Sequence, residues 1–273
     1  MLNRYIQIGC EYRKMVSNII LMFKRNQFIF EELVKRDFKQ KYKRTIIGMV
    51  WSVLSPLLML SVLAAIFGQF FGNSVPNYVI YLFSGQVVFN YYMESTNEGM
   101  NALMGNASIF SKINVPKYLF LFSKNVSALI NFGIILLIYF AFVWFEGITF
   151  TWKFLCLFYP VVCLILINMG MGFILSALFV FFRDIQYLYR LFTQVVMYGS
   201  AIFYSIDSLP EKIQKLFFCN PIYVCIHYFR SIVINDTIPE LWIHILLAGY
   251  AIVLFVIGCF VYKKYNFKFL YYV

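Results

Sequence analysis

The feature that most constrains this chain is a stretch from Thr45 to Met93 that contains no Asp, Glu, Lys or Arg. Its first part, residues 46–71, spans about 26 residues, or roughly 39 Å as a helix. That length exceeds the hydrocarbon core of a bilayer, about 30 Å, so the helix can cross with a tilt or a kink at Pro56. The stretch therefore predicts a membrane protein.

The composition supports the same class. Hydrophobic residues make up 62% of the chain and charged residues 13%, whereas charged residues make up about 25% of soluble domains. A net charge of +11 is typical of the Lys- and Arg-rich cytoplasmic loops of membrane proteins, so no nucleic-acid partner is expected. The six cysteines show no spacing typical of a metal or redox site. We expect an all-α polytopic membrane protein.

Polar and charged breaks divide the chain into six predicted transmembrane helices. The first break is GNSVPN, residues 72–77. The predicted spans are residues 46–71, 78–93, 125–145, 154–182, 185–204 and 241–262, and the second can continue past Glu94. They form one six-span transmembrane domain, residues 45–273, which follows an N-terminal segment, residues 1–44.

The distribution of basic residues tests this arrangement. With the N-terminus inside, all of the 23 Lys and Arg residues fall in inside segments except Lys153, Lys212, Lys215 and Arg230. Such a bias is typical of the cytoplasmic side of membrane proteins. It predicts six spans with both termini in the cytoplasm.

A basic amphipathic helix is predicted directly before the first span. Apolar residues recur there at helical spacing, at Phe30, Leu33, Val34, Phe38 and Tyr42. Lys and Arg gather on the opposite face, and a helix of this kind lies in a membrane surface. We therefore expect residues 1–44 to be a cytoplasmic segment with an interface helix that contacts membrane lipids.

No catalytic signature is found. The chain has no GxxxxGK[ST] phosphate loop and no HExxH sequence, and its two histidines are not spaced as a metal pair. We therefore expect no catalytic residue, no metal site and no enzyme activity. Two other classes stay open: an ion-coupled lipid-linked-glycan flippase or other secondary transporter, and a membrane-embedded transferase. The first normally needs carboxylates inside the membrane, for which Glu94 and Glu98 are the nearest candidates.

Three short stretches carry more specific information. They are NASIFSKINVPK at residues 106–117, FFRD at residues 181–184, and LPEKIQKLFFCNPIYVCIHYFR at residues 209–230. The residues singled out in the last two are Arg183, Asp184, Asn220, Pro221 and Arg230. Together with the amphipathic helix, this set resembles the permease subunits of bacterial type-two ABC polysaccharide exporters, which export O-antigen, capsule or teichoic acid. The resemblance covers essentially the whole chain and rests on the order of the motifs and the topology.

The resemblance implies a set of partners. It implies a homodimer that works with two copies of a separate cytoplasmic ABC ATPase, and a lipid-linked polysaccharide as substrate. ATP and magnesium would bind to the ATPase, so no cofactor is expected in this chain. The implied location is the bacterial inner membrane.

The resemblance also assigns roles to two cytoplasmic segments. The amphipathic helix would frame the substrate entrance, through Lys35, Arg36, Phe38, Lys39, Lys41 and Arg44. The segment over about residues 100–115, here called the coupling segment, would dock into the ATPase together with Pro116. Its assigned residues are Gly105, Asn106, Ile109, Phe110, Lys112 and Ile113. We expect Ile109, Phe110 and Ile113 to form an exposed apolar face suited to a groove on another protein; the alternative is that they pack back under the spans.

Two further expectations concern the other side of the membrane. The resemblance implies short re-entrant helices before the last span, and IYVCIHYF, residues 222–229, is apolar but too short to cross. Aromatic residues make up 21% of the chain, and sugar rings stack on aromatic rings. The expected pore aromatics are Phe67, Phe70, Phe71, Phe203 and Tyr204, although aromatic residues also favour membrane interfaces without lining a pore.

Small residues at four-residue spacing allow helices to approach closely. Such stripes occur at Ala64, Gly68 and Gly72, and at Gly172 and Ser176. They serve packing either within one chain or between two copies.

Overall fold

The computed structural model describes residues 26–40, 48–72, 75–113, 115–207 and 209–272, and all regular elements within these ranges are helical. The expectation of an all-α protein is confirmed for these ranges. The first described element is a helix over residues 26–40, here called the N-terminal helix. The elements that follow are α2 (Gly48–Phe71), α3 (Tyr78–Asn101), η1 (Met104–Asn106), α4 (Ala107–Phe110), α5 (Tyr118–Phe145), η2 (Trp152–Leu157), α6 (Phe158–Phe181), α7 (Ile185–Tyr198), α8 (Glu211–Phe217), α9 (Pro221–Val233), α10 (Leu241–Tyr265) and α11 (Phe269–Tyr272).

Four of the described helical stretches are long and apolar enough to cross a membrane. They are Val50–Phe71, Tyr118–Phe145, Trp152–Phe181 and Leu241–Tyr265. A fifth is added if α8 and α9 count as one broken span, since the two helices are bent by 104° at the break between them. The expected re-entrant geometry before the last span agrees with this bend.

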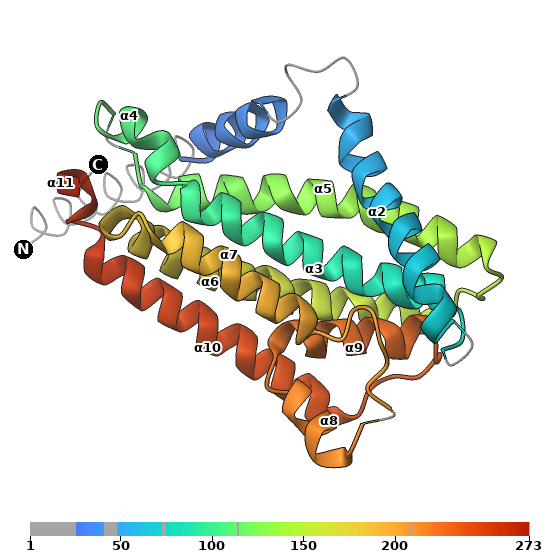
Figure 1. The fold of residues 1–273 in the computed structure, drawn as a ribbon. Coiled ribbons are helices and arrows are strands. Elements are labelled where there is room, and N and C mark those ends of the chain that lie inside the picture. The colour runs from blue at the N-terminus through green and yellow to red at the C-terminus, as the bar shows by residue number, and fades with distance from the viewer. Residues whose placement is uncertain (1–25, 41–47, 73–74, 114, 208, 273) are drawn as a thin grey trace, which may run out of the picture.

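The long helices form one bundle (Figure 1). Helices α3, α5, α6 and α10 run side by side, with α6 packed against both α3 and α10, and α3 packed against α5. Helix α2 crosses α3 at a steeper angle, and α8 and α9 lie at the opposite end of the bundle from α4 and α11. In the middle of the bundle, every residue of α3 from 82 to 89 is buried.

Glycines let the α6 backbone contact its two neighbours directly. A Cβ atom at Gly170 would clash with the carbonyl of Leu254 in α10, and one at Gly258 would clash with the carbonyl of Gly170. On the other side of α6, a Cβ atom at Gly99 of α3 would lie 3.0 Å from the Cα of Gly172. The small-residue position Gly172 thus serves packing within the chain.

The second predicted span differs from the helix that is observed. Helix α3 starts at Tyr78 as expected but continues past 93 to Asn101. The polar residues that suggested a loop fit a helix because they form hydrogen bonds along it or across it. Asn97 and Asn101 donate to main-chain carbonyls one turn earlier, at 2.7 and 2.8 Å, and Glu94 accepts a hydrogen bond from Asn131 of α5 at 2.8 Å.

The fifth predicted span, residues 185–204, is wrong in its second part. Helix α7 ends at Tyr198 after 14 residues, or about 21 Å, which is shorter than the hydrocarbon core. Beyond it the main chain breaks from helical geometry, with a positive φ of 47° at Ala201. Apolar composition alone suggested a continuous helix, whereas the bonds that hold this break come from α9.

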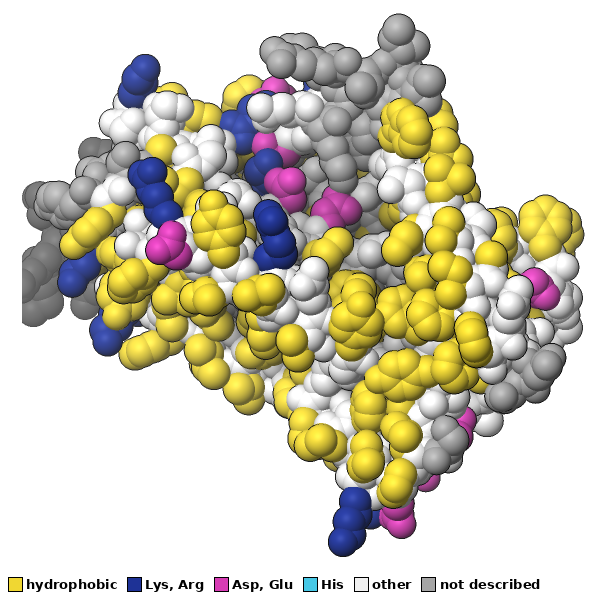
Figure 2. Space-filling model, viewed as in Figure 1, with side chains coloured by type: hydrophobic (Ala, Val, Ile, Leu, Met, Phe, Trp, Pro, Cys, Tyr) yellow, Lys and Arg dark blue, Asp and Glu magenta, His cyan; other side chains and the backbone are white. Residues whose placement is uncertain are grey.

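The surface has the polarity of a membrane protein. Figure 2 shows apolar side chains across the middle of the visible face, with charged side chains gathered near the N-terminal helix and α4 at one end and near α8 at the other. An apolar surface of this extent needs an apolar environment. The bundle is therefore arranged for a bilayer, with both charged ends in contact with water.

We expect Gly170→Ala to destabilise the bundle. The added methyl group forces α6 and α10 apart, and overpacking of this kind costs about 1–3 kcal/mol. The matched control is Gly249→Ala in α10, because a Cβ atom there meets nothing within 4 Å. Thermal unfolding of both variants in detergent checks the prediction, and equal melting temperatures would contradict it.

Candidate functional site

A buried carboxylate anchors the N-terminal helix to the bundle. Asp37 is 4% exposed. It accepts hydrogen bonds from the Ser123 hydroxyl of α5 at 2.9 Å and from the Arg36 guanidinium at 2.7 Å, and the Lys124 ammonium lies 3.7 Å away. A buried charge without such partners is strongly destabilising. The pairing of Asp37 with α5 therefore fixes where the N-terminal helix sits.

The same group of charges reaches the coupling segment. The Arg36 Nη2 atom donates to the Asn106 side-chain oxygen at 2.7 Å, and the Asn106 amide nitrogen donates to the Ala102 carbonyl at 2.7 Å. On the other side, Lys124 pairs with Glu98 of α3 at 2.9 Å. The structure thus brings together two segments, the N-terminal helix and the coupling segment, that the sequence assigned to separate roles.

These residues surround a polar cleft of about 330 Å³ between the N-terminal helix, α3 and α5. Its lining carries two basic and three acidic side chains together with amides and hydroxyls. The lining residues are Arg36, Asp37, Gln40, Glu94, Glu98, Asn101, Gly105, Asn106, Lys124, Ser127 and Ala128. Charges of both signs make this cleft suited to polar groups and water rather than to lipid chains.

The coupling segment faces the bundle more than expected. Phe110 is only 6% exposed and packs near Phe120 of α5, with ring centroids 6.1 Å apart. The expectation that Ile109, Phe110 and Ile113 form one exposed face is therefore wrong: Phe110 points inward and Ile109 is half-buried. Ile113, by contrast, is 57% exposed.

The remaining residues assigned to the coupling segment show a mixed pattern. Gly105 and Lys112 are exposed, Asn106 is buried and Pro116 is half-buried. The outward surface of the segment is thus formed mainly by its last turn, around Lys112 and Ile113.

Of the residues assigned to the substrate entrance, Arg36 and Phe38 are half-buried, whereas Lys35 and Lys39 are exposed. Lys35 forms an exposed ion pair with Glu32 at 2.9 Å, and exposed pairs of this kind contribute little to stability. Lys41 and Arg44 lie outside the described residues.

At the opposite end, Arg230 of α9 holds the chain break after α7. Its guanidinium donates to the carbonyls of Ala201 at 2.9 Å, Ile202 at 3.0 Å and Tyr81 at 3.1 Å, and it lies 3.4 Å from the centre of the Tyr81 ring. The Ala201 and Ile202 oxygens lie outside any helix, so these bonds provide the donors that they need. The Tyr81 carbonyl belongs to α3. Gly85 leaves room for this arrangement, since a Cβ atom there would lie 3.0 Å from Arg230 Nη2.

Asn220 supports the same break from the start of α9. Its amide nitrogen donates to the Gly199 carbonyl at 3.0 Å and to the Ser200 hydroxyl at 2.9 Å, while its oxygen accepts from the Ile222 main-chain nitrogen at 3.0 Å. Asn220 is therefore the N-cap of α9, with Pro221 in the first turn. The motif residues Asn220, Pro221 and Arg230 thus build one structural unit, here called the outer knot.

The other motif pair has a simpler place. Arg183 and Asp184 are both exposed in the turn between α6 and α7. Asp184 precedes the first residue of α7, where a negative charge is favourable for the helix dipole.

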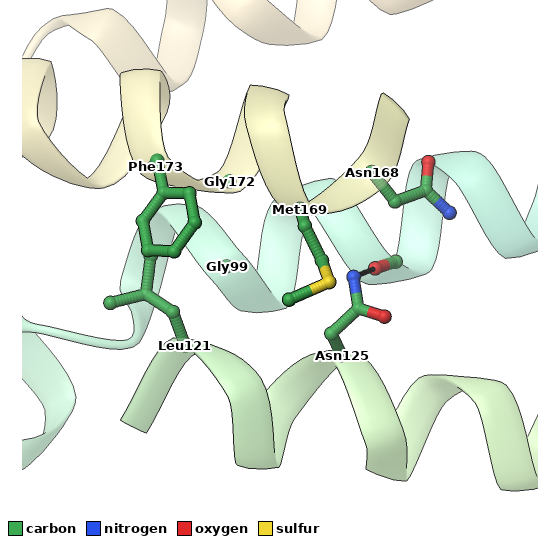
Figure 3. A pocket seen from close by; sticks show the side chains of 8 residues that line it. Gly99, Leu121, Asn125, Asn168, Met169, Gly172 and Phe173 are labelled. Atoms are coloured by element: carbon green, nitrogen blue, oxygen red, sulfur yellow. Dashed lines mark hydrogen bonds between the residues drawn. The ribbon is translucent and has the colours of Figure 1, made fainter. Parts of the chain in front are cut away.

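The centre of the bundle is closely packed. A cavity of about 10 Å³, the size of one water molecule, lies between α3, α5 and α6 (Figure 3). Met169, Leu121 and Phe173 fill the space around it, and the Asn125 amide donates to Ser95 at 2.8 Å. This cavity is far too small for a sugar ring.

Comparisons with known proteins agree with this architecture. Residues 29–234 match the ABC-2 type transporter family. The chain belongs to the ABC-2 type transporter family. It is 26% identical over 251 residues to an O-antigen export system permease protein of Klebsiella pneumoniae, covering 89% of this chain and 95% of that protein. The resemblance to type-two ABC permeases is thereby confirmed.

Two further relatives extend the comparison. An O-antigen export system permease protein of Myxococcus xanthus is 23% identical over 226 residues, 81% of this chain and 86% of that protein. A polysialic acid transport protein of Escherichia coli is 21% identical over 221 residues, with shares of 80% and 86%. Each of these matches covers at least four-fifths of the chain.

The expected pore aromatics of the permease lie at the same end of the bundle as the outer knot. Phe67 of α2 stacks on Phe203, with centroids 5.4 Å apart, and lies 6.4 Å from Phe71. Phe203 is buried, Phe70 is 74% exposed, and the Tyr204 hydroxyl donates to the Tyr198 carbonyl at 2.8 Å. The structure thus brings Phe67, Phe71 and Phe203 together and leaves Phe70 facing away from the chain.

Sequence reasoning missed Asp37 and its partner Ser123. A signal was present, because Asp37 follows Phe30 by seven residues and Leu33 by four. This spacing places the carboxylate on the apolar face of the N-terminal helix. An acidic residue on an apolar face indicates a buried partner.

We expect Arg230→Met to destabilise the permease by about 3 kcal/mol, because several buried carbonyls lose their donor. Arg190→Met, at an exposed arginine of α7, is the matched control and should change the stability by less than about 0.5 kcal/mol. Arg230→Lys should fall between the two, since it keeps the charge and loses the planar fork. Thermal unfolding in detergent measures all three, and a stable Arg230→Met variant would refute the role of the outer knot.

Proposed function

We propose that the chain is the transmembrane subunit of an ATP-driven ABC exporter for lipid-linked polysaccharide in the bacterial inner membrane. The observation that carries this proposal is the match over nearly the full chain to O-antigen export permeases. The family supplies the class of transporter, and the relatives supply the class of cargo. ATP and magnesium bind to a separate ATPase subunit, which supplies the energy for the permease.

Six membrane crossings with cytoplasmic termini are part of the proposal. Helix α3 is too polar to resemble a span by composition, but Ser84, Gln86, Ser95 and Thr96 are buried among the surrounding helices. Residues 199–204, in which the outer knot binds the carbonyls of residues 199, 201 and 202, continue the path of α7 toward the outer surface. The N-terminal helix then lies on the cytoplasmic surface of the membrane, where its exposed lysines meet anionic headgroups.

The residues of the polar cleft support a link between ATPase docking and the substrate entrance at the cytoplasmic end. The Arg36–Asn106 hydrogen bond joins the N-terminal helix, proposed as the frame of the substrate entrance, to the segment proposed to dock into the ATPase. Movement of that segment therefore acts on the entrance directly. The carboxylates of the alternative ion-coupled mechanism, Glu94 and Glu98, are held by Asn131 and Lys124, which favours a structural role for both.

A homodimer provides the path for the glycan across the membrane. The bundle centre around the small cavity of Figure 3 has no room for a glycan. Most of α2 is exposed, including Met59, Ile66 and Phe70. Two copies that face each other through this helix would form the path between them, with aromatic rings at its outer end. The two copies would bind two ATPase subunits.

The proposal is tested in the native host. The tagged permease, purified in mild detergent, should retain an ABC ATPase, and deletion of its gene should remove surface polysaccharide while lipid-linked polymer accumulates inside. Transport that persists without ATP and responds to an ion gradient would overturn the proposal in favour of a secondary transporter.

The proposed topology predicts opposite labelling at two exposed positions. In a cysteine-free background, Pro76→Cys should react with a membrane-impermeant maleimide in intact cells, because residues 72–77 face outward. Lys112→Cys should react only after the cells are opened. Labelling of Lys112→Cys in intact cells would contradict cytoplasmic placement of the coupling segment.

The proposed docking surface predicts a selective effect of one charge. Ile113→Asp places a carboxylate on the exposed last turn of the coupling segment, and we expect ATPase co-purification and export to fall at least about tenfold, because a hot-spot truncation costs about 2 kcal/mol or more. Ile238→Asp, at an exposed isoleucine before α10, is the matched control. Equal ATPase retention by the two variants would place the docking surface elsewhere.

A further inference from the structure

A single lysine connects the coupling segment with the C-terminal end of the chain. Lys117 directly precedes α5. Its ammonium donates to the Asn266 carbonyl at 2.8 Å and lies 5.6 Å from the ring centre of Phe110 and 5.7 Å from that of Phe269. One charged group thus contacts a residue 149 positions further along the sequence. Figure 1 shows α11 at the same end of the bundle as α4.

The two rings beside Lys117 belong to one apolar cluster. Phe269 is fully buried and lies 5.4 Å from Tyr262 of α10 and 6.1 Å from Phe181 of α6, measured between ring centroids. Phe110 and Leu33 of the N-terminal helix are part of the same cluster. The C-terminal tail, residues 266–272, is therefore packed against the bundle. Partial burial lowers the pKa of Lys117, in keeping with an ammonium group removed in part from water.

The coupling segment depends on contacts of this kind for its position. Its helices η1 and α4 contain three and four residues, and helices so short are not stable by themselves. Tertiary contacts fix it at both ends: Arg36 binds Asn106 near its start, and Lys117 covers Phe110 near its end. As long as Phe110 stays buried, Ile113 is the residue that faces outward.

We propose that Lys117 and the C-terminal tail position the coupling segment for docking of the ATPase. The inference rests on the proposed function, since it assigns the tail a part in presenting the same docking surface. Lys117 acts as a positioning residue: it holds Phe110 in the apolar cluster and thereby fixes the direction of Ile113. The tail supplies the Asn266 carbonyl and the Phe269 ring that hold Lys117 in place.

The first test measures hydrogen exchange in the purified full-length permease. In Lys117→Met, which keeps an apolar stem of similar length, amides over residues 104–116 should exchange on the order of tenfold faster, because a hydrogen bond and two cation–π contacts are lost. Lys117→Arg keeps the charge and the donor and should restore slow exchange. Lys263→Met, at an exposed lysine of α10, is the matched control. Unchanged exchange in Lys117→Met would overturn the proposal.

The second test removes the tail. A chain that ends at Tyr265 should also show faster exchange over residues 104–116, and adding Lys117→Met to it should have a smaller effect than in the full-length chain, because the contacts of Lys117 with Asn266 and Phe269 are already gone. ATPase co-purification should fall in Lys117→Met and recover in Lys117→Arg. Additive effects on exchange, or faster exchange with full ATPase retention, would overturn the positioning role.

The two tests separate this inference from the function on which it rests. Failure of the unaltered permease to retain an ATPase would refute the proposed function, whereas the exchange measurement would still report whether Lys117 and the tail hold the coupling segment.

Discussion

The constraint on which the fold most depends is that main-chain carbonyls outside a helix need donors in an apolar environment, where each one left without a partner costs about 1–3 kcal/mol. The break after α7 exposes such carbonyls at residues 199, 201 and 202, and Asn220 and Arg230 bind all three. An irregular segment is tolerated at membrane depth only where it is buried in protein in this way. Arg230 therefore permits α7 to end early and α8 and α9 to turn back.

The end of the bundle near the N-terminal helix depends on charged groups in the same way. Asp37 is buried because Ser123, Arg36 and Lys124 surround it. Without these partners the N-terminal helix would have only its apolar face to hold it, and that face suits lipid as well as protein. At both ends of the bundle, then, a polar side chain on a short helix selects one position out of several that the apolar surfaces allow.

The sequence was informative where apolar composition decides the structure. Helices α2, α6 and α10 come from stretches with few or no charges, and composition alone identifies them as membrane-spanning helices. The sequence was less informative where residues distant along the chain determine the local structure. The polar second half of α3 resembles a loop until Asn131 is placed beside Glu94, and α7 resembles a longer helix until Arg230 binds the carbonyls beyond its end. The inward direction of Phe110 likewise depends on Phe120 and Lys117, which local spacing does not place.

The contacts of the N-terminal helix also determine how it can move. Arg36 and Asp37 are adjacent, yet Arg36 is bound to the coupling segment and Asp37 to α5. A displacement of the coupling segment therefore acts on the helix through Arg36, while Asp37 holds the same turn on α5. Leu33 packs in the same apolar cluster as Phe110 and lies four residues before Asp37, so the helix is held to the bundle on both sides of Arg36.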